Sequence, residues 1–152
     1  MFAEGHAFAL HSATRRYMLM APSELAYELE AAASHIETLA GSRPCRAFRP
    51  HAGWRGGEML TGLREIDYTL VGWGWMLWDF NWFRPRRADD TVARVAWRIR
   101  GGDIVVMHDG DESAPTRDQR PTVDATSRLI PALRKRGLSF GTVCHSPGPT
   151  PE

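Results

Sequence analysis

Short apolar segments that end in polar residues alternate along this chain with stretches of helical periodicity. Residues 8–11 form the first apolar segment. Between Pro22 and Gly41, apolar residues then recur every three or four positions, which predicts a helix whose first turn holds proline and whose end is set by glycine. The inward stripe of this helix is expected to be Leu25, Leu29, Ala32, Ile36 and Leu39. A repeated strand and helix favours a parallel α/β fold with right-handed crossovers.

The remaining chain continues this alternation. Further strands are expected over residues 45–49, 68–72, 103–107 and 138–143. Further helices are expected over residues 58–64, from Asp89 or Asp90 to about residue 100, and over residues 122–136. The last of these is expected to bury Val123, Ile130 and Leu133. Residues 1–144 are thus predicted to form one domain, and the Pro/Gly-rich residues 145–152 a flexible tail.

Composition narrows the classes of function. The 152 residues are 43% hydrophobic and 24% charged, as in an ordinary globular domain with a core. A formal charge of +1 gives no reason to expect nucleic acid or an acidic membrane surface as a partner. No stretch approaches the ~20 apolar residues of a membrane span. No signal-peptide pattern is visible, so a cytoplasmic location is expected if Met1 is the true start.

Two cysteines, Cys45 and Cys144, are too few for a disulfide framework or a thiolate metal site. Free cysteine is among the most buried residue types, so both are expected to be buried free thiols. They do not settle the cellular compartment.

Four motifs place chemically active side chains at or just beyond predicted strand ends. They are Gly5-His6-Ala7-Phe8-Ala9-Leu10-His11-Ser12, Phe48-Arg49-Pro50-His51-Ala52-Gly53, Trp75-Met76-Leu77-Trp78-Asp79-Phe80-Asn81-Trp82 and Ile104-Val105-Val106-Met107-His108-Asp109. In parallel α/β folds the active site gathers at the carboxyl ends of the strands. We therefore expect the motifs to meet on one rim.

Together these motifs resemble the later motifs of the polysaccharide deacetylase (NodB-homology) family, whose members use a metal-bound water to remove acetyl groups from N-acetylated sugars. The resemblance covers about residues 4–143. It implies an incomplete (β/α) barrel of about five parallel strands and four helices. The family's opening Thr-Phe-Asp-Asp-Gly motif, which supplies the catalytic base and a metal ligand, has no place before His11. The resemblance therefore implies an N-terminally truncated member with impaired hydrolysis.

The resemblance makes His11 a ligand of a divalent, zinc-like metal. His11 is the first histidine of the family's His-Ser/Thr-x-x-His motif, but the second position here is Arg15. A guanidinium stays cationic and cannot ligate a metal. One of three protein ligands remains, so a metal is not expected to bind tightly. The other interpretation of His11 is a loop-end or capping histidine.

Arg49 matches the family arginine that orients the catalytic aspartate, and Pro50 and Gly53 match one wall of the substrate groove. His51 and Ala52 depart from the family's proline and aromatic residue. The plain alternative is a strand that ends at proline and is followed by a glycine turn.

His108 matches the family histidine that protonates the departing amine, a task suited to an imidazole near neutral pH. Val106 replaces the leucine that lines the acetyl pocket. Trp82 matches the family tryptophan, whose indole suits a sugar face. Asn81 stands where an aspartate tunes the catalytic histidine, and Asp79 is a possible substitute. Three further aromatics are expected to be core: Trp73, Trp75 and Trp78.

Three explanations of the absent first motif stay open. The chain could begin at an internal methionine of a full deacetylase, or be a catalytically inactive paralogue that binds sugar with its aromatic groove. It could also be completed by a partner or by self-association across the open barrel edge. Arg15 favours the second or third explanation. A small α/β module that binds another protein is the alternative outside the family.

Overall fold

The computed structural model describes residues 4–12, 14–72, 74–76, 87–110 and 116–145. The chain divides into two compact units. One contains Met1–Gly72 and Gly141–Glu152, and the other contains Trp73–Phe140. The predicted domain of residues 1–144 thus comprises two units, and most of the predicted tail lies outside the described residues.

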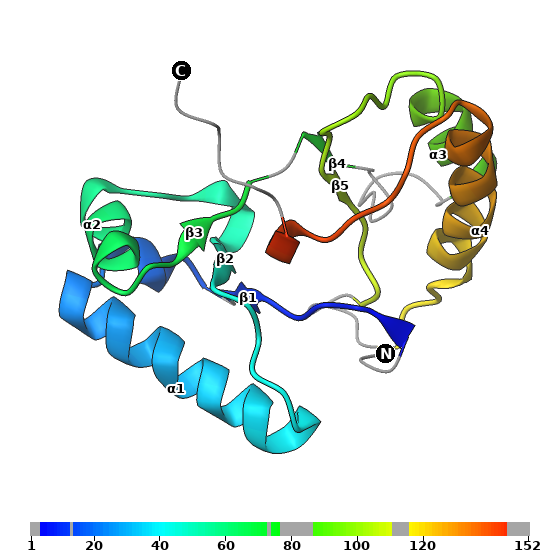
Figure 1. The fold of residues 1–152 in the computed structure, drawn as a ribbon. Coiled ribbons are helices and arrows are strands. Elements are labelled where there is room, and N and C mark those ends of the chain that lie inside the picture. Colours follow the sequence, from blue (N-terminus) through cyan, green and yellow to red (C-terminus); the bar gives the residue numbers. More distant parts are fainter. Residues whose placement is uncertain (1–3, 13, 73, 77–86, 111–115, 146–152) are drawn as a thin grey trace. The chain divides into compact units, whose positions relative to one another are not determined.

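A three-stranded parallel sheet forms the centre of the first unit (Figure 1). Its order is β1 (Leu10–His11), β2 (Ala47–Arg49) and β3 (Thr69–Leu70). Phe48 on the central strand lies opposite Leu10 and Leu70 and is fully buried. All three strands lie within predicted segments but are shorter.

Helices α1 (Pro22–Ala40) and α2 (Gly57–Glu65) pack together in this unit. Gly62 makes this contact possible, because a Cβ at that position would lie 3.0 Å from backbone atoms of Pro22. Helix α1 ends as predicted at Gly41, whose φ is 70°. Its buried residues are Leu25, Leu29 and Ala33. The predicted stripe is wrong at Leu39, which is 74% exposed because the core does not reach the last turn of the helix.

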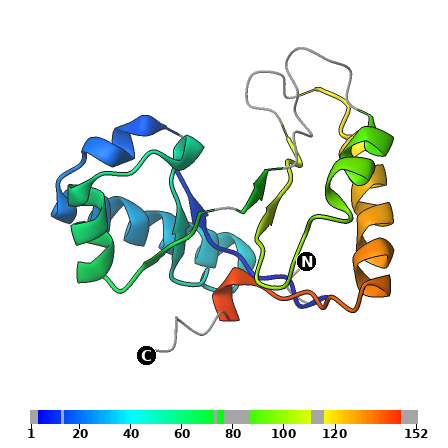
Figure 2. The same ribbon diagram turned by 90° about the horizontal axis from the view of Figure 1, so that it is seen from above.

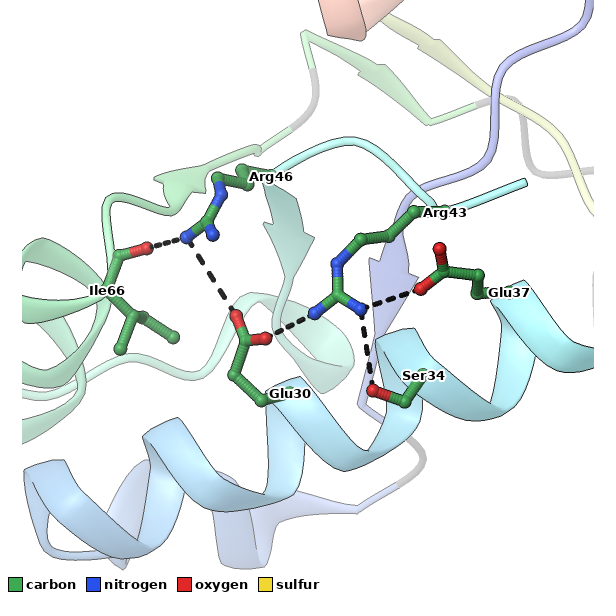
Figure 3. A network of polar contacts seen from close by, with 6 residues as sticks. All are labelled: Glu30, Ser34, Glu37, Arg43, Arg46 and Ile66. Carbon is green, nitrogen blue, oxygen red and sulfur yellow. Dashed lines mark hydrogen bonds and ion pairs between the residues drawn. The ribbon is translucent and has the colours of Figure 1, made fainter.

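A polar network holds the segment after α1 against that helix (Figure 3). The Arg43 guanidinium contacts the carboxylates of Glu30 and Glu37. The Arg46 guanidinium lies 3.8 Å from the second oxygen of Glu30 and donates to the carbonyl of Ile66. Glu30 therefore bridges two arginines of the segment that leads into β2.

Cys45 and Cys144 form a disulfide, with Cα atoms 5.7 Å apart and a sequence separation of 99. The prediction of two free thiols was wrong. The pair forms because the chain returns: the Cys45 amide donates to the carbonyl of Phe8 at 2.8 Å, and the Cys144 sulfur lies 3.9 Å from the same oxygen. Sequence spacing alone does not indicate that return.

The second unit contains two paired parallel strands, β4 (Trp75–Met76) and β5 (Val105–Val106). Helices α3 (Ala88–Val95) and α4 (Arg120–Lys135) lie side by side (Figure 2). Their buried core is formed by Val95, Ile99, Leu129 and Leu133. The Arg136 guanidinium donates to the carbonyls of Ala96 and Ile99 and so satisfies two carbonyls just after the end of α3.

Three expectations for residues 87–143 were wrong. Residues 138–143 are not a strand: the Leu138 amide bonds to the carbonyl of Leu133, and the chain then reaches a short 3₁₀ turn, η4 (Val143–His145). Val123 is 67% exposed, because α4 turns Thr122, Ala125, Leu129 and Leu133 inward instead. Neither Asp89 nor Asp90 caps α3; both lie in its first turn, where their charge suits the helix dipole.

The observed fold is α/β, with every described strand pair parallel and four α-helices within the described residues. This confirms the predicted fold class. None of the helices in the described ranges combines the length and apolarity needed to cross a membrane.

Candidate functional site

Two of the predicted motifs are directly bonded at the carboxyl ends of β1 and β2. His11 lies opposite Arg49 in the strand register. The Arg49 carbonyl oxygen lies 2.9 Å from His11 Nδ1 and 3.1 Å from the amide nitrogen of Ser12. The Oγ of buried Ser12 accepts a 2.7 Å hydrogen bond from the His51 amide. The first unit thus brings these predicted site residues together.

The bond to Arg49 fixes the tautomer of His11. A carbonyl oxygen can only accept, so Nδ1 carries the hydrogen and donates it. In the neutral ring Nε2 then holds the lone pair. Histidine ligands in metal sites are oriented in the same way, by donating their other ring N–H to a carbonyl. The imidazole is therefore held as a ligand or a base would be.

Arg49 is half-buried at the end of β2. Its Nη2 donates to the carbonyl of Gly72 at 3.3 Å, while its buried Nε has no acceptor among the described residues. Burial lowers the pKa of Arg49 because it removes water from the cation. A buried donor without a partner costs roughly 1–3 kcal/mol, so this side chain favours an additional acceptor.

The loop after Arg49 holds its backbone in an uncommon conformation. Pro50 is buried, and the short 3₁₀ turn η3 (His51–Gly53) contains Ala52 at a φ of 48°. The left-handed region costs a residue with a Cβ roughly 1–2 kcal/mol. The Ser12–His51 bond and a 3.0 Å bond from the Trp54 amide to the His51 carbonyl hold this turn in place. Strain of this kind is often found at binding sites.

Arg15 and Trp54 form a contact that the sequence reasoning missed. Arg15 begins the 3₁₀ helix η2 (Arg15–Leu19), and its Cζ lies 5.7 Å from the centroid of the Trp54 ring. Trp54 is 49% exposed. Its place directly after the Arg49–Gly53 motif was the available signal, because an aromatic residue on a site loop is suited to sugar binding.

The second unit carries His108 and Val106. Val106 is buried on β5, and half-buried His108 follows it by two residues. That His108 shares a rim with His11 stays a prediction. Trp82 and Asp79 lie outside the described residues.

No family model matches the chain. Known proteins do. A chitooligosaccharide deacetylase of Bradyrhizobium is 33% identical over 156 residues, which cover 92% of this chain and 66% of that protein. A peptidoglycan-N-acetylglucosamine deacetylase of Bacillus cereus is 32% identical over 96 residues, covering 63% of this chain and 42% of that protein. This chain belongs to the polysaccharide deacetylase (NodB-homology) family. The chain matches about two fifths of the length of the Bacillus cereus protein and about two thirds of the length of the Bradyrhizobium protein.

Solved structures share the fold of the deacetylase family. A family 4 carbohydrate esterase of Streptomyces lividans superposes with a TM-score of 0.73 at 23% identity, covering 93% of this chain and 68% of that one. A family 4 pseudoenzyme of Bacillus anthracis gives a TM-score of 0.64 at 26% identity, covering 84% of this chain and 41% of that one. The fold class is therefore the α/β barrel type of these esterases.

An acetyl xylan esterase of Clostridium thermocellum was solved with a cobalt ion. It is 26% identical with a TM-score of 0.60, and the match covers 78% of this chain and 52% of that one. A divalent metal therefore fits the family. The described residues of this chain do not fit one. No group of three or more His, Cys, Asp or Glu side chains in the described ranges could hold a metal ion. Arg15, four residues after His11, brings a permanent positive charge instead of a second imidazole.

Proposed function

We propose that this chain is a polysaccharide deacetylase-type protein for N-acetylated carbohydrates, in which hydrolysis of the acetamide bond is impaired. The named activities of the two curated relatives support the carbohydrate and the reaction type. One observation supports the impairment. Arg15 occupies the second histidine position of the metal motif, and its Cζ lies over the Trp54 ring, 5.7 Å from the centroid. A fixed cation there opposes a divalent ion electrostatically.

The proposed roles of the other residues follow from their positions. Arg49 has a buried donor without an acceptor in the described residues, which suits it to orient a carboxylate. Pro50 and Gly53 belong to the fixed loop beside it and would form a wall of the groove. His108 would protonate the departing amine, because imidazole titrates near neutral pH. Val106 would line the acetyl pocket.

Trp82 and Asp79 are proposed substrate-binding residues on the strength of the family motif alone. An indole offers apolar area to the C–H face of a sugar, together with one hydrogen-bond donor. Asp79 would restore negative charge near His108 if it substitutes for the family aspartate at Asn81.

A second candidate is a catalytically inactive paralogue that retains carbohydrate binding. Two observations favour it: the similarity to a pseudoenzyme of the same esterase family, and the cation at Arg15. Self-association across an open sheet edge would accompany either function, because β1 is an edge strand of its sheet within the described residues.

The test is acetate release from chitopentaose by the full chain, with zinc or cobalt present and absent. We expect release at background for the natural sequence and for Arg15→His, because no Thr-Phe-Asp-Asp-Gly segment that would supply the catalytic base occurs in this sequence. Arg15→His should instead bind zinc or cobalt more tightly than the natural chain, measured by calorimetry, because it replaces a cation with a second imidazole. The matched control is Arg16→His, which adds the same side chain one residue away and should leave metal binding as weak as in the natural chain. Metal-dependent release by the natural chain would overturn the proposed impairment.

Binding of the same oligosaccharide, measured by calorimetry, separates the candidates from a module that binds only protein. Binding of the oligosaccharide without acetate release by the natural chain supports the inactive paralogue. No binding at millimolar sugar, combined with a concentration-dependent dimer, would favour the protein-binding module.

A further inference from the structure

Arg15 has no acidic partner among the described residues, in contrast to three other arginines of the first unit. Arg16 pairs with Glu24 at 2.8 Å, and Arg43 and Arg46 share Glu30. In the described residues the Arg15 side chain makes no hydrogen bond or ion pair, and its one ring contact is with Trp54, at 5.7 Å from the ring centroid. Stacking on an indole holds a guanidinium in one plane and leaves its in-plane N–H groups able to donate.

Trp54 is also held in place while half of its surface remains open. Its amide bonds to the His51 carbonyl at 3.0 Å, and the His51 amide bonds to Ser12 of the neighbouring strand end. The next residue, Arg55, is exposed and has no carboxylate partner in the described residues. Glu58, in the first turn of α2, pairs with neither arginine. The indole is thus flanked in sequence and space by uncompensated positive charge.

Unpaired guanidinium donors recognise a planar carboxylate, and an open indole recognises the apolar face of a sugar ring. Either feature alone is common on protein surfaces. Their direct contact, on a loop whose turn is fixed in an uncommon backbone conformation, selects a ligand that carries both groups. A neutral N-acetylglucosamine oligomer would leave the Arg15 donors to water.

We propose that Arg15 and Trp54 form a subsite for a carboxylate-bearing N-acetylated saccharide, with the carboxylate accepting from Arg15 and a sugar ring on Trp54. This inference rests on the proposed function, because it takes an N-acetylated carbohydrate as the ligand. Arg15 would then have two effects: its charge opposes a metal ion, and its donors select an acidic saccharide.

The experiment compares two disaccharides by calorimetry on the full chain. N-acetylglucosaminyl-N-acetylmuramic acid carries a carboxylate, and di-N-acetylchitobiose does not. We expect the acidic disaccharide to bind about tenfold more tightly, as a charge-assisted bidentate pair allows, and this preference to shrink as salt is raised. Arg15→Gln should equalise the two affinities, and Arg15→Lys should restore part of the preference as a point charge without the fork.

Trp54→Ala should weaken both ligands, whereas the control Arg16→Gln should change neither. Arg15, Arg16 and Trp54 are all exposed, so the variants are expected to keep the thermal unfolding temperature of the natural chain. Equal affinities in the natural chain would overturn this inference and leave the proposed function standing. Failure of both disaccharides to bind at millimolar concentration would overturn both. Acetate binding as tightly as the acidic disaccharide would reduce the site to a bare anion site and also overturn the inference.

Discussion

His11 and Arg49 face each other across β1 and β2, and the imidazole of one donates to the backbone carbonyl of the other at 2.9 Å. The same carbonyl accepts from the Ser12 amide at 3.1 Å. Two motifs that are 38 positions apart are therefore joined through one oxygen atom. The orientation of the His11 ring depends on the β1–β2 register, since a slip of one residue would turn its side chain to the other face of the sheet.

Ser12→Ala should destabilise the chain. The Ser12 hydroxyl is buried and accepts from the His51 amide at 2.7 Å, so its loss leaves that amide without a partner. We expect a loss of about 1–3 kcal/mol in the free energy of unfolding, measured by urea denaturation. Ser42→Ala is the matched control, because Ser42 is exposed in a turn and should change stability by less than ~0.5 kcal/mol. Equal effects of the two substitutions would show that the bond does not support the loop.

The Cys45–Cys144 disulfide should protect the chain against unfolding. It links residues 99 positions apart, and closure of so long a loop in the unfolded chain contributes up to about 4–5 kcal/mol in the chain-entropy model. Dithiothreitol should therefore lower the thermal unfolding temperature of the natural chain. The double variant Cys45→Ser with Cys144→Ser should unfold at that lower temperature and be insensitive to the reductant. Labelling of two thiols by maleimide in the denatured, unreduced protein would contradict the bond.

The local signals of the first unit were enough to predict its strands and α-helices but not the 3₁₀ helices η2 and η3. Helix α1 begins at Pro22 and ends before Gly41, and both limits depend on the backbone preferences of these residues alone. Such preferences can be recognised in the sequence. His11 and Arg49 were placed correctly at strand ends for the same reason. Their mutual bond follows once parallel strands are placed side by side.

Long-range contacts could not be predicted in this way. Cys144 meets Cys45 because the chain returns to the first unit at Gly141, and residues 138–143 accordingly are not a strand. Val123 and Leu39 fit a helical stripe but are exposed, since periodicity identifies a helix without showing how far its partner extends. The Arg15–Trp54 contact also depends on tertiary packing, of η2 near α2.

Glu30→Gln should weaken the attachment of residues 43–46 to α1. Glu30 contacts both Arg43 and Arg46, and the change leaves two cations near each other without their shared carboxylate. These side chains are 36–52% exposed, so solvent screening should keep the loss well below that expected for Ser12→Ala. Urea denaturation at low salt and at 1 M salt measures it, and the difference should shrink at high salt. Glu65→Gln, at an exposed residue that makes no ion pair within the described part of the chain, is the control. A loss that does not depend on salt would rule out an electrostatic origin.

Tyr68 should make stability fall at alkaline pH. The phenol is buried against the first core, and burial, followed by the charge of Glu30, raises its pKa above the ordinary value. Because the folded chain then holds this proton more tightly than the unfolded chain, the stabilisation is complete below about pH 10, the ordinary tyrosine value, and is lost as pH rises through the folded pKa. Urea denaturation between pH 9 and pH 11.5 should show this decline, and Tyr68→Phe should flatten it. Tyr27→Phe, at a residue 74% exposed, should leave the decline intact. An equally steep decline in Tyr68→Phe would assign the alkaline sensitivity to another group.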